Sequence, residues 1–271
     1  MKKSSIAAIA KKQHRLFLYA GGFFLIVAAV LAVMRLSPPP GDELFFYCGA
    51  GLRPVADEIA ELFTAETGIN VRADYGPSSI LLGRISVSGE GDLFMPGDES
   101  YVREAEELKL IHESRSAASW LPVIMVQAGN PKNIGGLSAL TGPGIRLALA
   151  DERIAAVGRV SRLLFDKNMI PLDDIEKNLV YEGVTVHDVA TAVKLGHVDA
   201  AIVWQPVAAA YENAEIVRIP PSGNIVSPIP LAVLSFSGNK QAAGEFMDFV
   251  LSERGQDVFK KHNYGAVAHE E

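Results

Sequence analysis

Hydrophobic positions between residues 44 and 82 change from a short apolar run to helical spacing and back. Residues 44–48 are apolar and aromatic with glycine close on both sides, as in a buried parallel strand. The next apolar residues recur with the spacing of one helix face: Val55, Ile59, Leu62 and Phe63. Gly68 is placed to cap that helix, and residues 69–75 alternate like a second strand. The pattern predicts a βαβ unit.

The same alternation of strand and helix patterns continues to the end of the chain. Further strands are predicted at residues 91–95, 118–127, 145–150, 179–181, 199–204, 215–219 and 229–236. Further helices are predicted at residues 78–87, 98–110, 136–140, 159–167, 185–195, 242–251 and 253–261. Such alternation is typical of an α/β protein with mostly parallel sheets.

Two glycine-containing turns, at residues 49–51 and 76–79, each follow a predicted strand and open a predicted helix. In open α/β sheets, ligands bind at the carboxyl ends of strands. Backbone N–H groups at the start of a helix suit an anion there. The two turns therefore predict a binding site for a small anion.

The N-terminal segment has the pattern of an export signal. Residues 1–15 are basic, and residues 16–34 carry no charge over a length close to that of a bilayer span. The basic flank predicts a cytoplasmic N-terminus and an exported remainder. The segment is either an uncleaved signal anchor, which we favour, or a cleaved signal peptide. Residues 35–43 form a proline-rich linker.

Charge is distributed unevenly along the chain. Six of the 25 Lys and Arg residues and none of the 32 Asp and Glu residues lie in residues 1–40, which leaves a net charge of −13 on the remainder. Such an acidic body argues against nucleic-acid binding. The single cysteine, Cys48, excludes an intrachain disulfide and is expected to be a small buried strand residue.

Motifs of the common catalytic and cofactor sites are absent from the sequence. It contains no phosphate-binding loop with Gly-Lys-Ser/Thr, no His-Glu-x-x-His and no Gly-x-Ser-x-Gly. The turn at residues 49–51 lacks the third glycine of a dinucleotide-binding fingerprint. We therefore expect no enzyme activity, no cofactor and no cation bound directly by protein ligands.

Seven short motifs occur in a recognisable order. They are FYCGAGL, AELFTAETGINV, YGPSSILLGRI, GDLFMPGDESYV, IRLALADERIAAVGR, LGHVDAAIVW and KHNYG. In this order they resemble the periplasmic molybdate-binding proteins, which belong to the two-lobed solute-binding proteins of ABC importers. The resemblance implies a type II fold with a hinge between two α/β lobes. Lobe 1 would contain residues 44–120 and 230–271, and lobe 2 residues 121–229.

The resemblance also implies a site built from neutral donors at helix starts. The hydroxyl and N–H of Ser78, with the N–H of Ser79, would bind the oxyanion, although Ser78 also fits an ordinary helix cap. Gly51 stands where the family usually has a serine, so that only its N–H remains. Val157 and Val186 would each contribute a backbone N–H.

An aromatic residue completes the implied site. Trp204 replaces the family tyrosine; its indole N–H can donate but not accept, and a purely structural role is the alternative. Arg53 and Arg159 lie at predicted helix starts beside the site. They would either add positive charge there or form surface ion pairs.

The function implied is capture of molybdate or tungstate for delivery to an ABC permease. The protein would be a monomer in the periplasm or on the extracytoplasmic face of the membrane, tethered by the N-terminal helix or released by cleavage. The glutamate-rich helix segment from Glu104 to Glu107 would either dock the permease or form a solvated face. Two alternatives remain: the same fold with sulfate or phosphate as ligand, or a membrane-tethered anion sensor.

Overall fold

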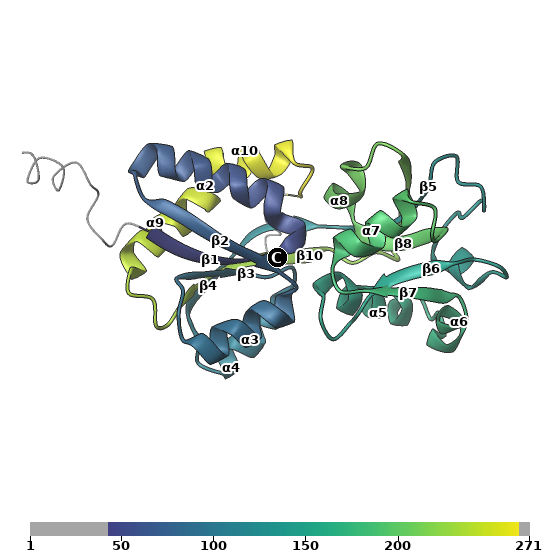
Figure 1. Cartoon of the computed structure of the whole chain (residues 1–271), viewed down its shortest axis with the longest axis horizontal. Coiled ribbons are helices and arrows are strands. Elements are labelled where there is room, and N and C mark those ends of the chain that lie inside the picture. The colour runs from purple at the N-terminus through teal and green to yellow at the C-terminus, as the bar shows by residue number, and fades with distance from the viewer. Residues whose placement is uncertain (1–42, 266–271) are drawn as a thin grey trace, which may run out of the picture. The chain divides into compact units, whose positions relative to one another are not determined.

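The computed structural model describes residues 43–265, which belong to a compact unit formed by residues 43–271 (Figure 1). The predicted basic N-terminus, signal segment and most of the linker lie in residues 1–42, outside the described residues. Within residues 43–265 no helix is long and apolar enough to cross a bilayer.

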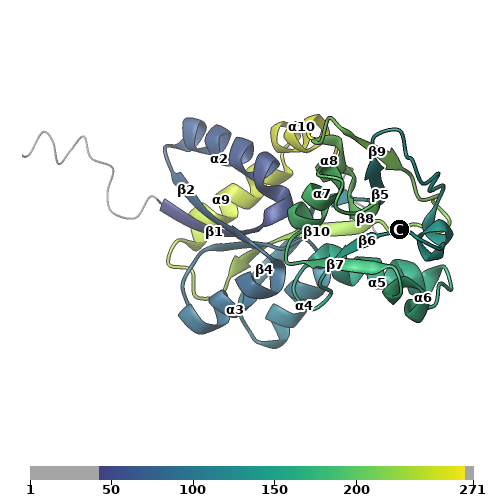
Figure 2. The same cartoon turned by 45° about the vertical axis from the view of Figure 1, so that its right-hand side comes forward.

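The first sheet has five strands in the order β2-β1-β3-β10-β4. Their bounds are β1 (Glu43–Gly49), β2 (Asn70–Gly76), β3 (Leu93–Met95), β4 (Ile111–Trp120) and β10 (Ser227–Leu234). One face carries α2 (Arg53–Thr67), α9 (Lys240–Leu251) and α10 (Glu253–Lys261), and the other carries α3 (Ser78–Ser88) and α4 (Glu99–Glu107), as Figures 1 and 2 show. A 3-10 turn, η1 (Ala50–Leu52), joins β1 to α2.

The second sheet also has five strands, in the order β7-β6-β8-β5-β9. Their bounds are β5 (Pro122–Gln127), β6 (Leu147–Ala150), β7 (Leu179–Gly183), β8 (Ala200–Trp204) and β9 (Ala214–Val217). Helices α7 (Val186–Lys194) and α8 (Gln205–Ala209) lie on one face, and α5 (Ala156–Lys167) and α6 (Leu172–Glu176) lie on the other (Figures 1 and 2). The 3-10 turn η2 (Leu137–Thr141) precedes β6.

The chain crosses between the two sheets twice. The first crossing is at Leu121, between β4 and β5, and the second lies between β9 and β10. Trp120 and Ser227 are paired in the β4–β10 ladder, so the two crossings start side by side. The side-chain amide of Asn224 donates to the carbonyl of Pro122 at 3.1 Å. The fold is therefore two-lobed, with one sheet in each lobe.

The prediction of mostly parallel sheets is wrong, because both sheets are mixed. In the first sheet β1 pairs in parallel with β2 and β3, whereas β10 is antiparallel to β3 and β4. In the second sheet β6 pairs in parallel with β7 and β8, whereas β5 is antiparallel to β8 and β9. The cause is the double crossing, since β5 and β10 each enter their sheet from the other lobe.

Several predicted boundaries differ from the structure. The strand predicted at residues 118–127 is two strands, β4 and β5, separated at Leu121. The first half of β4 was missed because it is a polar edge strand with several exposed residues. Helix α5 begins at Ala156, three residues before the prediction, and the short helices α6 and α8 were not predicted.

The opening βαβ unit is confirmed. The buried side chains of α2 include Val55, Ile59 and Phe63, as the apolar spacing predicted. Gly68 ends the helix with φ 78°, a left-handed conformation that glycine adopts at little cost, and its N–H donates to the carbonyl of Thr64. Cys48 is buried in β1, and burial raises its pKa well above the usual value, which keeps the thiol neutral.

Candidate functional site

A small cavity lies where strands of both sheets end. Its volume is about 30 Å³. The lining residues follow the carboxyl ends of strands or open helices: Gly49, Ala50, Gly51, Gly76, Pro77, Ser78, Gly97, Trp120, Ala155, Ala156, Val157, Thr185, Val186 and Trp204. Both lobes contribute, so the cavity lies between them. The site predicted at the turns 49–51 and 76–79 corresponds to the part formed by the first lobe.

Ser78 is the first residue of α3, and its side chain is 3% exposed. Residue 77 at the N-cap position is proline and offers no side-chain cap. The N–H of Ser78 has no hydrogen-bond partner among residues 43–265. Its Oγ accepts the N–H of Gly97 at 3.1 Å. One Oγ lone pair is thus occupied, and the hydroxyl hydrogen remains available to donate into the cavity.

The first turn of α5 leaves two more backbone donors unpaired. The N-cap residue is Ala155, whose carbonyl accepts the N–H groups of Gly158 and Arg159. The N–H groups of Ala156 and Val157 precede them and find no partner within the described part of the chain. Both residues line the cavity and are buried.

The start of α7 is capped only in part. Thr185 and Asp188 form a capping box in which each side chain accepts the backbone N–H of the other residue. The N–H groups of Val186 and His187, between these two residues, have no partner in residues 43–265. Three helix N-termini therefore present unpaired donors at one cavity.

Three carbonyl groups around the cavity, those of Gly97, Gly51 and Ala50, are by contrast already engaged by side chains. The carbonyl of Gly97 accepts Nε1–H of Trp120 at 3.1 Å, and that of Gly51 accepts the hydroxyl of Tyr264 at 2.8 Å. Burial raises the pKa of Tyr264, so this hydroxyl stays protonated and keeps donating. Nε2 of His187 lies 3.2 Å from the carbonyl of Ala50, which can only accept.

The electrostatics of the cavity favour an anion. None of the described lining residues has an ionisable side chain. The positive ends of the α3, α5 and α7 dipoles meet there, beside N–H groups that lack partners. A buried polar group left unpaired costs about 1–3 kcal/mol. A ligand that only accepts hydrogen bonds would remove several of these penalties at once.

Five of the six predicted site residues line the cavity: Gly51, Ser78, Val157, Val186 and Trp204. The indole N–H of Trp204 makes no hydrogen bond to another described residue. Ser79 is placed differently, because its N–H and its Oγ both donate to the carbonyl of Ile154, at 3.3 and 3.0 Å. In this conformation Ser79 therefore joins the two lobes and has no donor left for a ligand.

The two arginines considered as sources of charge do not line the cavity. The guanidinium of Arg53 lies over the ring of Tyr75, 4.1 Å from its centroid. That of Arg159 lies over Tyr101, also at 4.1 Å, and donates to Oγ of Ser100 at 2.5 Å. Positive potential in the cavity thus comes from helix ends and not from these side chains.

Sequence reasoning missed Gly97 and Trp120 as site residues. Gly97 lies in the turn after β3, at the same edge of the sheet as the two turns that were recognised. Applying the strand-end rule to every strand would have found it. In the sequence, residue 120 marked only the end of the first part of lobe 1, and nothing local places the Trp120 ring beside Trp204.

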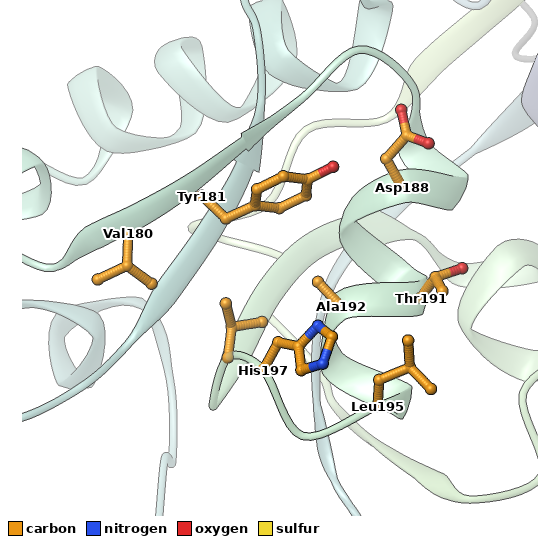
Figure 3. Close-up of a pocket in the computed structure, with 8 residues that line it drawn as sticks. Val180, Tyr181, Asp188, Thr191, Ala192, Leu195 and His197 are labelled. Carbon is orange, nitrogen blue, oxygen red and sulfur yellow. The ribbon is translucent and has the colours of Figure 1, made fainter.

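A larger cavity of about 470 Å³ lies on the second lobe, between β7 and α7 (Figure 3). Its lining includes exposed apolar side chains such as those of Val180 and Leu195. Its polar groups are partly paired within the protein: Oγ1 of Thr191 lies 3.3 Å from the hydroxyl of Tyr211. It lacks converging unpaired donors, so the smaller cavity is the candidate site.

Comparison with known proteins gives a consistent picture. The family model described as bacterial extracellular solute-binding protein matches residues 44–265. The molybdate-binding protein ModA of Mycobacterium bovis is 26% identical over 222 residues, covering 80% of this chain and 82% of that protein.

Two solved structures show the same fold. The sulfate-binding protein SubI from Mycobacterium tuberculosis aligns with a TM-score of 0.76 and 19% identity, covering 83% of this chain and 87% of that chain. The periplasmic molybdate-binding protein of Azotobacter vinelandii aligns with a TM-score of 0.69 and 19% identity, covering 82% of this chain and 98% of that chain. The likeness extends over both lobes.

Proposed function

The chain belongs to the family of bacterial extracellular solute-binding proteins, and we propose that its solute is a tetrahedral oxyanion, with molybdate or tungstate preferred. Members of this family bind solutes and are not enzymes. In our proposal the loaded protein delivers the anion to an ABC permease. The similarity to a molybdate-binding protein supports the choice of anion.

One observation carries the proposal: donors in the cavity are free while neighbouring acceptors are occupied. We assign ligand contacts to the hydroxyl and N–H of Ser78, the N–H groups of Gly51, Val157 and Val186, and Nε1 of Trp204. Each is a neutral donor, and hydrogen bonds from such donors to an ionised group are stronger than those between neutral groups. A cation would find no carboxylate among the lining residues.

The excess of free hydrogen-bond donors over free acceptors in the cavity predicts that the protein discriminates among oxyanions. Phosphate retains a proton near neutral pH, and that proton needs an acceptor. The carbonyls of Gly51 and Gly97 are already engaged by Tyr264 and Trp120. Bound hydrogen phosphate would have to share an acceptor that already holds another donor, such as one of these carbonyls or Oγ of Ser78, and losing that bond in a buried site costs up to about 1–3 kcal/mol. Fully deprotonated molybdate, tungstate and sulfate avoid this cost.

Binding is expected to close the lobes. The anion would receive donors from α3 in the first lobe and from α5 and α7 in the second, so that a closed form binds it better than an open one. Contacts between the lobes already present support this view, including Ser79 with Ile154 and His187 with Ala50.

We propose an extracytoplasmic location, since the family is extracellular. The uncharged residues 16–34 would tether the protein to the membrane or serve as a cleaved signal. Mass measurement of the protein recovered from cells decides between these two forms. A mass that includes residues 1–34 indicates the tether, and its loss indicates cleavage.

Calorimetric titration of the purified protein with molybdate, tungstate, sulfate and phosphate tests the proposed ligand. We expect tight binding of molybdate or tungstate, weaker binding of sulfate and the weakest binding of phosphate. Chloride at equal ionic strength controls for general screening. If none of the four anions releases heat or changes the melting temperature, the oxyanion proposal is wrong. If phosphate binds best, the conclusion that the cavity lacks a free acceptor for the phosphate proton is wrong.

A further inference from the structure

Two tryptophans from different sheets form one wall of the cavity. Trp120 is the last residue of β4 and Trp204 the last residue of β8. Their ring centroids are 4.2 Å apart, their planes are inclined by only 11°, and each residue is 2% exposed. An offset or parallel aromatic pair of this kind is a stable arrangement. The stacked pair therefore forms a rigid boundary of the site, in which Nε1–H of Trp204 is the unpaired polar group.

Trp120 is held in place from several directions. Its Nε1–H donates to the carbonyl of Gly97, and one face stacks on Trp204. The ring of Tyr264 lies 5.8 Å from it at an inclination of 25°. A side chain fixed by a hydrogen bond and by two aromatic neighbours cannot turn aside to admit a larger ligand without losing these contacts.

Two glycines leave the space that the indole occupies. A Cβ atom at position 97 would lie 2.9 Å from the Trp120 ring, and one at position 51 would lie 3.4 Å from it. The position 51 Cβ would also lie 3.3 Å from Cγ1 of Val186. The Trp120 indole thus occupies the space next to the cavity that side chains at positions 51 and 97 would otherwise fill.

We propose that Trp120 is a specificity-determining residue that limits the site to unsubstituted oxyanions. The inference rests on the proposed oxyanion function. The remaining cavity of about 30 Å³ has room for a compact group and not for an organic substituent attached to it. With the indole in place, phosphomonoesters and other substituted oxyanions are excluded. Removing the ring opens space directly beside the anion, where a substituent can enter.

The test compares the wild-type protein with Trp120→Ala, using the four inorganic anions and phenyl phosphate at pH 8. At that pH phenyl phosphate is a dianion, because the second pKa of such monoesters is about 6. We expect wild-type protein to bind its preferred oxyanion and to reject phenyl phosphate. In Trp120→Ala, affinity for phenyl phosphate relative to that oxyanion should rise by about 10-fold or more, within the range for changes in pocket size.

Phe63→Ala is the matched control. Phe63 is also a buried aromatic of the first lobe and packs on Phe246 at 5.1 Å, but it does not line the cavity. The Phe63→Ala variant should have a lower melting temperature than wild type but the same preference for the inorganic oxyanion over phenyl phosphate. A shift of the same size in this control would show that loosening of the lobe, and not the Trp120 wall, admits the ester.

The remaining outcomes separate the inference from the function. If wild-type protein binds an oxyanion and a folded Trp120→Ala still rejects phenyl phosphate, Trp120 does not set selectivity and the function stands. If wild-type protein already accepts phenyl phosphate, the inference also fails. If wild-type protein binds none of the inorganic anions, the proposed function fails and the inference with it.

Two milder variants keep the test decisive should Trp120→Ala not fold. Trp120→Phe retains a stacking ring and should admit methyl phosphate. Gly51→Ala should make the cavity smaller, because its new Cβ would crowd Trp120 and Val186. It should lower the affinity for molybdate and tungstate more than the affinity for the smaller sulfate. Unchanged selectivity in both variants overturns the inference.

Discussion

The carbonyl oxygen of Ile154 accepts both donors of Ser79: the backbone N–H at 3.3 Å and Oγ at 3.0 Å. Ser79 belongs to α3 of the first lobe, and Ile154 lies just before α5 of the second. The neighbouring Ser78 lines the cavity, so one dipeptide serves both the site and the contact between lobes. Anion binding at Ser78 and lobe closure at Ser79 are therefore expected to be coupled.

Replacing Ser79 by alanine tests this coupling. Ser79→Ala keeps the N–H bond to Ile154 and removes the Oγ bond, for a loss of about 0.5–1.5 kcal/mol from the closed form. Affinity should fall by about 2- to 10-fold for every oxyanion alike, since the lost bond does not touch the ligand. Calorimetry with molybdate and sulfate measures the change. A loss confined to one anion would place Ser79 in the ligand site itself.

Ser78→Ala should have a larger effect on binding. The hydroxyl hydrogen of Ser78 is available to the anion, and a hydrogen bond to a charged group contributes about 1.5–3 kcal/mol. We expect a loss of affinity of about 10- to 150-fold. Ser86→Ala is the matched control, because Ser86 lies on the same helix and its Oγ donates to the carbonyl of Leu82. If the two variants bind equally well, Ser78 is only a structural residue.

Gly97→Ala should hinder closure of the lobes. The added Cβ would lie 2.9 Å from Cβ of Ala156, which belongs to the other lobe, and equally close to the ring of Trp120. Overpacking of this kind costs about 1–3 kcal/mol, so anion affinity should drop by about 5-fold or more.

The matched control for this substitution is Gly83→Ala in α3. No atom lies within 4 Å of the Cβ that it would add. Alanine is also the better helix former, so this variant should bind normally and melt at an equal or higher temperature. Small-angle scattering with and without molybdate reports closure. A Gly97→Ala protein that closes and binds like wild type contradicts the prediction.

Asp199 should make the second lobe sensitive to acid. Burial would raise the pKa of Asp199, but hydrogen bonds from the side chain and backbone N–H of Arg146 outweigh it and hold that pKa below its ordinary value. A group whose pKa is lowered on folding stabilises the folded form above its unfolded pKa of about 3.9. This contribution is lost as the pH falls below that value.

Melting temperatures between pH 7 and pH 3 measure this contribution. Asp199→Asn should melt at least about 2–4 °C lower than wild type at pH 7. The difference should begin to shrink as the pH falls below about 3.9, the unfolded pKa, because the unfolded wild-type chain then takes up a proton at Asp199 that the folded form resists. Asp248→Asn is the control, since Asp248 pairs with Arg115 on the exposed surface and such pairs contribute little. Parallel pH profiles for wild type and Asp199→Asn would contradict the assignment.

Local patterns predicted much of the fold. The helix at residues 53–67 was found because apolar spacing and a terminal glycine are both local signals. The helix predicted at residues 185–195 corresponds to α7, at whose start the structure has a capping box of Thr185 and Asp188. The polar first half of β4 escaped notice because an edge strand needs no apolar alternation. The resemblance to solute-binding proteins is confirmed by the family match over residues 44–265.

The sequence by itself determined most of the α/β elements, the family and the turns at which Gly51 and Ser78 lie, because hydrophobic period, caps and strand-end turns act over a few neighbouring residues. Only the tertiary structure decided which strands run antiparallel and which hydrogen-bond partner each donor at the site has. Ser79 donates to Ile154, 75 residues away, whereas Ser78 keeps its proton for the cavity. The stacking of Trp120 on Trp204 likewise depends on two lobes meeting, and no local pattern encodes such a meeting.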